Sequence, residues 1–322
     1  MKAIKYMKYG LPANISYCEV PKPTIKDDLV LVEIHSASIN QADLYLLQGK
    51  PIFLRLSTGL FKPKNKILGS DISGVVAQVG KNITELKVGD EVFGELGMNQ
   101  DGGYAEYALA SPKQLGKKPK EISHSIVASV PMAGLTALQG LRLANINKDS
   151  NVLIYGASGG VGTFMIQVAK SFGATVTAVV STRNIEVAKA SGADHIIDYK
   201  KEKWDAGNKT YDIVVAANGE NKLKVYRDKL TNNGVFVMSG GTIKQLLGFF
   251  IKKPFMRKKK ERKFLNYVAK VNKSDLEILS NMLENNQLRP HIDKEFSLMD
   301  TKKALTHFYE GKTIGKTVIK IK

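Results

Sequence analysis

A glycine-rich turn between an apolar run and an amphipathic stretch constrains the fold of this sequence more than any other feature. The turn, GASGGVG (156–162), follows NVLIY (151–155) and precedes TFMIQVAKSFG (163–173). Such a turn at the start of a helix lets the backbone approach a pyrophosphate, which the N–H groups and dipole of the helix then stabilise. A merely tight strand–helix turn is the alternative. We expect a Rossmann-type domain whose phosphate-binding residues are Ala157, Ser158, Gly159, Gly160, Val161 and Gly162.

The pattern departs at one position from the usual G-x-G-x-x-G, because Ala157 stands where the first glycine is common. Gly159 then provides the close approach to the pyrophosphate, and Gly162 the close packing of helix against strand. The context of the turn supports this assignment, because strands and helical stretches alternate from about residue 123 onward. Apolar runs buried on both faces are typical of parallel strands, and we expect them at 151–155, 175–180, 195–199, 212–217 and 234–240.

The N-terminal part of the chain has a different pattern of apolar residues. From residue 1 to about 120, short apolar alternations are broken by Gly, Pro and Asp, as in 29–39, 73–80 and 89–94. This spacing predicts an antiparallel, barrel-like β domain. Since 322 residues exceed what one core usually organises, the sequence predicts two domains.

The C-terminal part is predicted to contain two helices and a strand. SDLEILSNMLENNQL (274–288) has the spacing of an amphipathic helix with Ser274 as its N-cap. The tail 301–322 predicts a further helix and a final alternating strand.

Composition narrows the cellular context. The only cysteine, Cys18, excludes an intrachain disulfide and a thiolate cluster for structural zinc, which fits a reducing cytoplasm. The N-terminus lacks an apolar signal core, and no apolar run approaches the roughly 20 residues that span a bilayer. We therefore expect a cytoplasmic protein.

The formal charge of +18 is concentrated in one place. KKPFMRKKKERK (252–263) contains eight basic residues and the single acid Glu261, so it contributes +7, and we interpret the remaining +11 as solvated surface. Around this run, 245–264 interleaves aromatic and basic residues. Two interpretations stay open: a peripheral contact with an anionic membrane, or a solvated cover of a pocket or an oligomer contact.

The end of the second strand indicates which dinucleotide is bound. An Asp or Glu there would hold the ribose 2′-hydroxyl of NADH. Instead Val180 is followed by Ser181, Thr182 and Arg183. Because hydroxyls and a guanidinium pair with a 2′-phosphate whereas a carboxylate repels it, the sequence favours NADPH. A solvated arginine at a helix start is the alternative.

Several ordered motifs over the whole length resemble the medium-chain dehydrogenase/reductase superfamily, specifically its zinc-independent, quinone oxidoreductase-like branch. The resemblance implies a GroES-like catalytic domain over 1–122, completed by about 285–322, and a doubly wound Rossmann domain over 123–284, with the active site between them. It also implies a homodimer. The motifs are SASINQADLYLLQG (36–49), LGSDISGVVAQVG (68–80), VGDEVFG (88–94), GGYAEYAL (102–109), GLTALQGL (134–141), GASGGVG (156–162), GADHIIDY (192–199) and GKTVIKI (315–321).

Departures from the zinc-dependent members of that superfamily are equally informative. Where those have a catalytic Cys, this chain has Asn40, and where they have Gly-His-Glu, it has Gly69-Ser70-Asp71. A further Cys ligand and the four-Cys lobe are also missing, and the five histidines lack ligand spacing. We expect no metal site.

The resemblance also assigns roles to individual residues. It implies that Asn40 and Tyr45 lie near the nicotinamide and the substrate, where Tyr45 would donate to a developing oxyanion and Asn40 would orient the ring or substrate. Asp43 would brace the site. An ordinary half-buried aromatic is the alternative for Tyr45. The cofactor contacts implied by the resemblance are Thr136, Tyr199, Asn218, Ser239 and Gly240.

These observations predict an NADPH-dependent, metal-free reductase of a quinone or an α,β-unsaturated carbonyl compound. Without a metal to polarise an alcohol, reduction is the favoured direction. The alternative, based on the charge of +18, is a catalytically silent NADPH-sensing or nucleic-acid-binding protein. The sequence contains no aromatic RNA-binding signature, which argues against nucleic acid as a partner.

Overall fold

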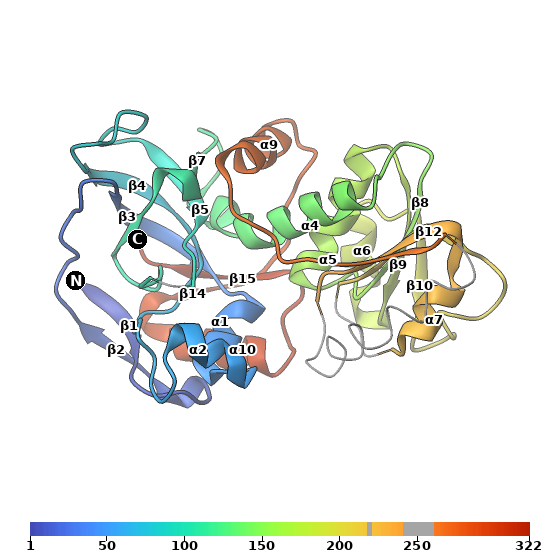
Figure 1. Cartoon of the computed structure of the whole chain (residues 1–322), viewed down its shortest axis with the longest axis horizontal. Coiled ribbons are helices and arrows are strands. Elements are labelled where there is room, and N and C mark those ends of the chain that lie inside the picture. Colours follow the sequence, from blue (N-terminus) through green and yellow to red (C-terminus); the bar gives the residue numbers. More distant parts are fainter. Residues whose placement is uncertain (99, 218–220, 241–260) are drawn as a thin grey trace. The chain divides into compact units, whose positions relative to one another are not determined.

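The computed structural model describes residues 1–98, 100–217, 221–240 and 261–322, and these form two compact units (Figure 1). Unit 1 comprises Met1–Leu135, Lys270–Asn286 and Ile292–Lys322. Unit 2 comprises Thr136–Ala269 and Gln287–His291. Each unit is built on its own main sheet.

Unit 2 contains a parallel sheet. Its strands are β8 (Asn151–Tyr155), β9 (Thr175–Val180), β10 (His195–Asp198), β11 (Tyr211–Ala216), β12 (Leu230–Met238) and β13 (Lys263–Asn266). They lie in the order β10-β9-β8-β11-β12-β13, and each neighbouring pair is parallel. Counted along the chain this is 3-2-1-4-5-6, the order of the dinucleotide-binding doubly wound fold. The predicted Rossmann-type sheet is confirmed.

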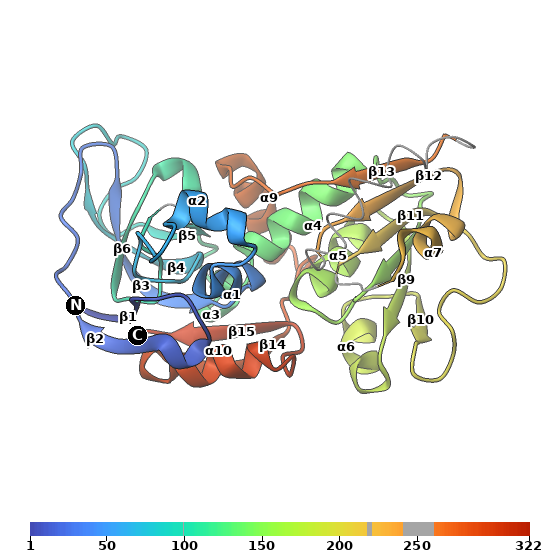
Figure 2. The ribbon, with the colours of Figure 1, turned by 60° about the horizontal axis from the view of Figure 1, so that its bottom comes forward.

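Helices cover this sheet and complete the unit. They are α5 (Gly160–Ser171), α6 (Ile185–Ala190), α7 (Leu223–Asp228), the 3-10 turn η4 (Thr182–Asn184) and most of α4 (Pro131–Leu143). Helix α5 packs on β8 and β9, α6 on β9 and β10, and α7 on β12 (Figure 2). Aromatic side chains dominate one core cluster of the unit, with Tyr226, Phe236 and Phe264 almost fully buried.

The five predicted strands of this sheet are found within a few residues of their expected positions. The sixth, β13, was not predicted, because its sequence KFLN has a single fully apolar pair between Lys263 and Asn266. It pairs with β12 and buries Phe264. It also occupies the end of the basic 245–264 segment, whose part up to residue 260 lies outside the described residues.

Unit 1 contains a mainly antiparallel sheet, as expected for a GroES-like domain. Its strands are β3 (Val30–Ser38), β4 (Asp71–Val79), β5 (Glu91–Glu95), β6 (Tyr107–Ala110), β7 (Leu115–Lys117), β14 (Ile292–Ser297) and β15 (Lys316–Lys320). The order is β14-β15-β3-β4-β5-β7, with β6 also paired to β3. Only the β14–β15 pair is parallel among these. A separate hairpin pairs β1 (Lys2–Tyr6) with β2 (Ile15–Glu19).

The remaining elements of unit 1 are short helices and turns. They are η1 (Pro12–Asn14), α1 (Gln41–Gln48), η2 (Ile52–Leu54), α2 (Arg55–Thr58), η3 (Pro112–Gln114), α3 (His124–Ala128), α9 (Lys273–Glu284), η5 (Leu298–Asp300) and α10 (Thr301–Tyr309). The predicted cap of α9 was wrong, because Asn272 rather than Ser274 accepts the Asp275 N–H, at 2.8 Å. The helix also ends before 288, since Asn286 adopts a left-handed φ of 57°.

The division into units differs from the expected boundary at 122. Helix α3 packs on β3, β4 and β15 of unit 1. The Met132 N–H, at the start of α4, donates to the Asp71 carboxylate at 3.0 Å. Helix α9 belongs to unit 1 as well, where it packs on β7. These contacts draw 123–135 and 270–286 into unit 1.

Candidate functional site

Three neighbouring strands of unit 1 bring polar residues into one row. The antiparallel register pairs Ser38 on β3 with Asp71 on β4, and Asp71 with Glu95 on β5. Directly opposed residues of adjacent strands project to the same face of a sheet. The Ser38 hydroxyl accordingly donates to Asp71 Oδ2 at 3.1 Å.

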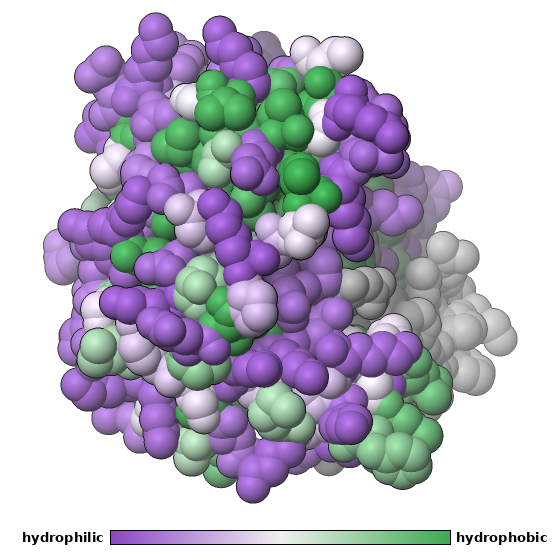
Figure 3. Space-filling model, turned by 90° about the vertical axis from the view of Figure 1, so that its left-hand side faces the viewer, coloured by the Kyte–Doolittle hydropathy of each residue, from purple (hydrophilic) through white to green (hydrophobic). Residues whose placement is uncertain are grey.

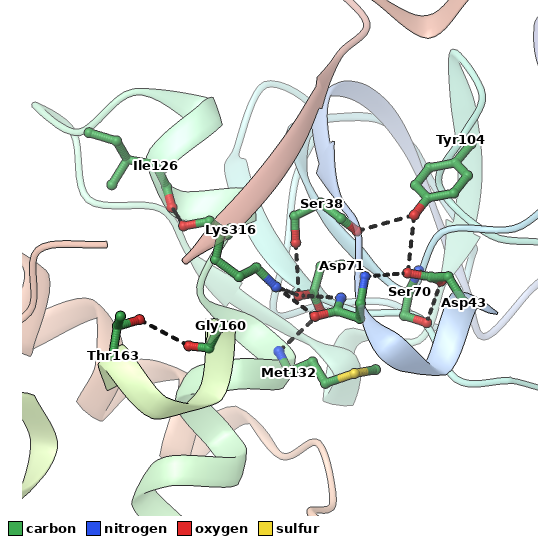
Figure 4. A network of polar contacts seen from close by, with 12 residues as sticks. Ser38, Asp43, Ser70, Asp71, Tyr104, Ile126, Met132, Gly160, Thr163 and Lys316 are labelled. Atoms are coloured by element: carbon green, nitrogen blue, oxygen red, sulfur yellow. Dashed lines mark hydrogen bonds and ion pairs between the residues drawn. The ribbon is translucent and has the colours of Figure 1, made fainter. Parts of the chain in front are cut away.

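The last strand adds a cation to this row. In the antiparallel pair of β15 with β3, Val318 lies opposite Ser38, and the Ile39 N–H donates to the Thr317 carbonyl at 2.9 Å. This register sets Lys316 beside Asn40. The Lys316 ammonium donates to Asn40 Oδ1 at 2.6 Å and lies 3.5 Å from Asp71 Oδ2. Figure 4 shows the lysine pointing towards the Asp71 carboxylate.

Helix α1 contributes the other half of the network. Asn40 is its N-cap, and the Asn40 N–H donates to Asp43 Oδ2 at 2.8 Å. Asp43 also accepts the Ser70 N–H and hydroxyl, each at 3.2 Å, and the Tyr104 hydroxyl at 3.0 Å (Figure 4). The amide nitrogen of Asn40 donates to Asp71 Oδ2 at 2.9 Å, which joins the two halves. We call these residues the buried polar cluster: Ser38, Asn40, Asp43, Ser70, Asp71, Glu95, Tyr104 and Lys316.

Burial controls the electrostatics of the cluster. Desolvation raises the pKa of Asp43 to about 6, although donors from Asn40 and Tyr104 oppose this shift. Desolvation also raises the pKa of Asp71 and lowers that of Lys316, while their mutual attraction opposes both changes. Because a buried charge is costly unless it is paired, we treat Asp71 and Lys316 as an ion pair.

Glu95 is the exception in this network. Its Oε2 atom is buried and has no hydrogen-bond partner among the described residues. Burial, reinforced by the charges of Asp71 and Asp43, raises the pKa of Glu95 to about 8. At neutral pH the carboxyl group of Glu95 is therefore protonated in most molecules. It lies beside the ionised pair of Asp71 and Lys316.

The two residues expected at the reaction centre differ in their surroundings. Both ends of the Asn40 amide are occupied, by Lys316 and by Asp71. Tyr45 lies on α1 and is half-buried, and burial raises the pKa of its hydroxyl. The Tyr45 hydroxyl therefore stays protonated at neutral pH and is able to donate a hydrogen bond.

The expected dinucleotide contacts lie along one edge of the unit 2 sheet. In a parallel sheet the carboxyl ends of all strands meet at the same edge, which is where ligands bind in open α/β sheets. The glycine-rich turn follows β8, Ser181 follows β9, Tyr199 follows β10 and Ser239 follows β12. The Tyr199 N–H donates to the Val180 carbonyl at 3.0 Å, so Tyr199 lies next to the end of β9.

The glycine-rich turn packs tightly at one glycine and is open at another. A Cβ atom at Gly162 would lie 2.2 Å from the Gly156 carbonyl oxygen, so only glycine fits there. At Gly159 the nearest atom would be 3.6 Å away, which leaves that side of the turn open to a ligand. Gly159 is also the N-cap of α5. The turn thus presents an open backbone at a helix N-terminus.

Asn184 is a neighbour of this turn that the sequence did not reveal. Its amide nitrogen donates to the Ser158 hydroxyl at 2.8 Å. Its Oδ1 atom is buried without a hydrogen-bond partner among the described residues. An acceptor of this kind beside the turn suits a ribose hydroxyl of a bound dinucleotide.

The residues after β9 are arranged unequally. Ser181 is buried, whereas Thr182 and Arg183 are exposed. The Thr182 hydroxyl donates to Asp198 Oδ2 at 2.7 Å, so its hydrogen is not available to a phosphate. Asp198 also accepts the Lys200 N–H at 3.0 Å, and these bonds lower its pKa. Arg183 remains the cation nearest the end of β9 in sequence.

The remaining expected contacts are placed as follows. The Thr136 carbonyl, on α4, accepts the Tyr267 hydroxyl. The Ser239 N–H donates to the Ala216 carbonyl at 3.2 Å, and a Cβ atom at Gly240 would lie 2.2 Å from the Ala217 carbonyl oxygen. Ser239 and Gly240 therefore lie at the ends of β11 and β12. Asn218 lies outside the described residues.

Two features are absent from the part of the chain that the structure describes. No group of three or more His, Cys, Asp or Glu side chains is arranged there to hold a metal ion. No helix there has the length and apolar character needed to cross a membrane.

Two protein-family models match the chain. The model for the alcohol dehydrogenase GroES-like domain matches residues 26–120. The model described as a zinc-binding dehydrogenase matches residues 191–319.

Curated relatives cover nearly the whole chain. A chloroplast envelope quinone oxidoreductase homolog of Arabidopsis thaliana is 32% identical, over 99% of this chain and 98% of the relative. An NADPH-dependent alkenal/one oxidoreductase of the same plant is 30% identical, over 99% and 79%. An NAD-dependent alcohol dehydrogenase of Sulfurisphaera tokodaii is 27% identical, over 99% of both chains.

A solved structure agrees with these matches. The quinone oxidoreductase from Coxiella burnetii is 31% identical and superposes with a TM-score of 0.88. The match covers 100% of this chain and 99% of that one.

Proposed function

The chain belongs to the medium-chain dehydrogenase/reductase superfamily as a quinone oxidoreductase-like enzyme, and from that premise we propose that it uses NADPH, without zinc, to reduce quinones or α,β-unsaturated carbonyl compounds. The names of the relatives support both substrate classes. Both are conjugated carbonyl compounds, in which the charge left by an added hydride delocalises onto oxygen.

The observation that carries the zinc-independent part is the chemistry of the donors in unit 1. By resemblance, Asn40, Ser70 and Asp71 stand where zinc-dependent members have their ligands. Here the Asn40 amide is bonded at both ends and the Ser70 hydroxyl donates to Asp43. Asp71 is paired with Lys316. Zinc needs three or four Cys, His or carboxylate ligands, so this donor set does not fit the metal.

The residues of unit 2 fit a nicotinamide dinucleotide. The open backbone at Gly159 and the N-terminus of α5 suit the pyrophosphate. Asn184 Oδ1, which has no hydrogen-bond partner in the described part of the chain, suits a ribose hydroxyl. Ser181 and Arg183 favour the 2′-phosphate of NADPH, because the second strand ends without a carboxylate. The carboxylate of Asp198 belongs to the neighbouring strand β10, not to the second strand. It accepts hydrogen bonds from Thr182 and Lys200.

The protein's own part in the reaction is to bind, orient and stabilise charge. When bound, the dinucleotide supplies the hydride. The protonated Tyr45 hydroxyl would donate to the oxygen on which negative charge develops. Asn40 acts as a positioning residue, because Lys316 and Asp71 fix its amide at the start of α1, the helix that carries Tyr45.

A substrate panel tests this function. The full-length protein is mixed with NADPH or NADH and with a simple quinone, an alkenal, an alkenone or a primary alcohol, and consumption or formation of the reduced cofactor is followed by its absorbance. We expect NADPH consumption with at least one conjugated substrate, slower reaction with NADH, no alcohol oxidation, and no effect of a chelator.

Two outcomes would contradict the proposal. If NADPH binds but no conjugated substrate consumes it, the reductase function is wrong. If activity disappears after chelation and returns only with zinc, the metal-free part is wrong.

A homodimer and a cytoplasmic location also remain proposals, based on the resemblance and on the single cysteine. Light scattering on the purified protein tests the first.

A further inference from the structure

A short segment of unit 1 exposes its apolar side chains and buries a polar one. Five of the exposed large hydrophobic side chains in the described chain lie within ten residues, and Phe61 is 88% and Leu56 76% exposed. Between them Thr58 is only 4% exposed. Figure 3 shows how hydrophobic residues reach the surface in patches on one face of the molecule. We call the segment the 52–61 platform, with its exposed apolar residues Ile52, Phe53, Leu56, Leu60 and Phe61.

The platform is fastened to unit 1 through its polar atoms. The Tyr9 hydroxyl donates to the Gly59 carbonyl at 2.6 Å and lies 3.1 Å from the Thr58 hydroxyl. The Arg55 guanidinium lies over the Tyr9 ring at 4.5 Å and donates from Nε to the Gly49 carbonyl at 2.9 Å. These contacts attach the segment to the rest of unit 1 while its apolar side chains stay exposed. The platform is therefore not part of the hydrophobic core.

Exposed basic residues flank these apolar side chains in the sequence. Residues 50–66 contain no Asp or Glu. The exposed basic residues of this stretch are Lys50, Lys62, Lys64 and Lys66. Exposed apolar side chains with lysines next to them are the pattern by which a protein surface enters the interface of an anionic bilayer.

We propose that the 52–61 platform docks this protein on an anionic lipid surface, with its apolar side chains among the headgroups and the flanking lysines on lipid phosphates. The aliphatic Ile52, Leu56 and Leu60 match lipid better than nucleic acid, which is bound through stacking and hydrogen bonds. A symmetric contact between two copies would bring these lysines together without an acid from 50–66 to pair with them. The proposal does not depend on the proposed reaction.

Vesicle flotation of the full-length protein tests this docking. The vesicles contain phosphatidylcholine alone or a mixture with phosphatidylglycerol, at low and at high salt. We expect binding to the mixed vesicles only, weaker at high salt because salt screens surface charges. Equal binding to both vesicle types, or binding to neither, would overturn the proposal.

Two variants locate the contact. F53S/F61S removes two exposed rings, and K62Q/K64Q/K66Q removes three charges. Each variant should lower the partition coefficient about tenfold or more. Their melting temperatures should stay at the wild-type value, because the substituted side chains are exposed.

Matched controls separate this platform from the rest of the molecule. M299S/V268S removes two apolar side chains that are 66% and 83% exposed elsewhere. K258Q/K259Q/K260Q removes three charges from the basic 252–263 run. Both should bind vesicles like the wild type. The proposal fails if the 258–260 variant loses binding instead, or if F53S/F61S changes only the sedimentation mass, which would assign the platform to a contact between copies.

Discussion

The Lys316 ammonium donates a 2.6 Å hydrogen bond to the side-chain oxygen of Asn40, 276 residues away in the sequence. Both side chains are buried, and the ammonium of the same lysine lies 3.5 Å from Asp71 Oδ2. This contact links the C-terminal strand of the chain to the N-cap of α1.

Replacing this lysine should destabilise the protein strongly. Lys316→Met leaves the fully buried Asp71 without its cation, and breaking a buried pair in this way typically costs about 3–5 kcal/mol. The free energy of unfolding in urea measures the effect. Lys320→Met, on the exposed end of the same strand, is the control and should lie within about 0.5 kcal/mol of wild type.

A double variant shows whether the broken Asp71–Lys316 pair causes the loss of stability in K316M. K316M/D71N removes both charges, so it should be more stable than K316M alone. Wild-type stability of K316M would contradict the assignment of Asp71 and Lys316 as an ion pair.

Glu95 should make stability depend on pH. Its pKa is raised from 4.5 to about 8, so the folded state binds a proton more tightly than the unfolded state does. The resulting stabilisation is complete below pH 4.5 and is lost as the pH rises through 8, by up to about 1.4 kcal/mol per pH unit. Glu95→Gln cannot titrate, so its stability relative to wild type should rise from about pH 4.5 to about pH 8 and stay level above pH 8.

Urea unfolding of both proteins across this pH range measures the difference. Glu106→Gln is the control, since Glu106 is only partly buried and forms a hydrogen bond with the Lys2 N–H. A difference between wild type and E95Q that does not change with pH would show that Glu95 titrates at an ordinary value.

Two glycines of the glycine-rich turn should respond differently to the same substitution. Gly162→Ala places a methyl group 2.2 Å from the Gly156 carbonyl oxygen, so it should lower the melting temperature and weaken dinucleotide binding. Gly159→Ala finds its nearest atom at 3.6 Å, so it should fold normally yet weaken NADPH binding by occupying the side of the pyrophosphate. Melting curves and NADPH titration by fluorescence separate the effects; unchanged binding by G159A would contradict the proposed pyrophosphate position.

The parallel sheet of unit 2 could be predicted from sequence because its signals are local. The turn at 156–162, the strand before it and the helix after it are contiguous, so a single stretch specifies the whole motif. The strand β13 escaped prediction because only Phe264 and Leu265 are apolar in it, and its pairing with β12 supplies the rest.

The buried polar cluster could not be predicted in the same way. Lys316 is one of 48 basic residues, and nothing in its neighbours distinguishes it from a surface lysine. Its burial follows from the register of β15 on β3. The pKa of Glu95 is likewise raised by burial and by the charge of Asp71, which the register of β5 on β4 places opposite it. Asn184 was missed because packing, not local sequence, buries its oxygen without a partner among the residues that the structure describes.

Tyr45 should affect turnover rather than binding. Tyr45→Phe removes the hydroxyl proposed to donate to the developing oxyanion, so kcat should fall roughly 100-fold with little change in KM. Steady-state kinetics with the best substrate of the panel measure both constants. Tyr309→Phe, on the exposed side of α10, is the control. An unchanged kcat in Y45F would show that the Tyr45 hydroxyl takes no part in the reaction and that the ring only packs.

Arg183 should determine the choice between NADPH and NADH. Its guanidinium is the charged group proposed to pair with the 2′-phosphate, while the Thr182 hydroxyl is committed to Asp198. Arg183→Ala should therefore weaken NADPH binding about tenfold or more, since a charge-assisted hydrogen bond contributes about 1.5–3 kcal/mol. NADH lacks that phosphate, so its affinity should stay the same.

Titration of both dinucleotides into wild type and variant measures this preference directly. Arg227→Ala, which breaks the surface pair with Asp228 on α7, removes the same charge elsewhere in unit 2 and should change neither affinity. The sensitivity to salt gives a second readout, because NADPH binding by R183A should depend less on ionic strength than binding by wild type. If R183A loses affinity for both dinucleotides equally, Arg183 supports the fold of the turn rather than the 2′-phosphate, and the preference for NADPH would have to come from Ser181 or Tyr199.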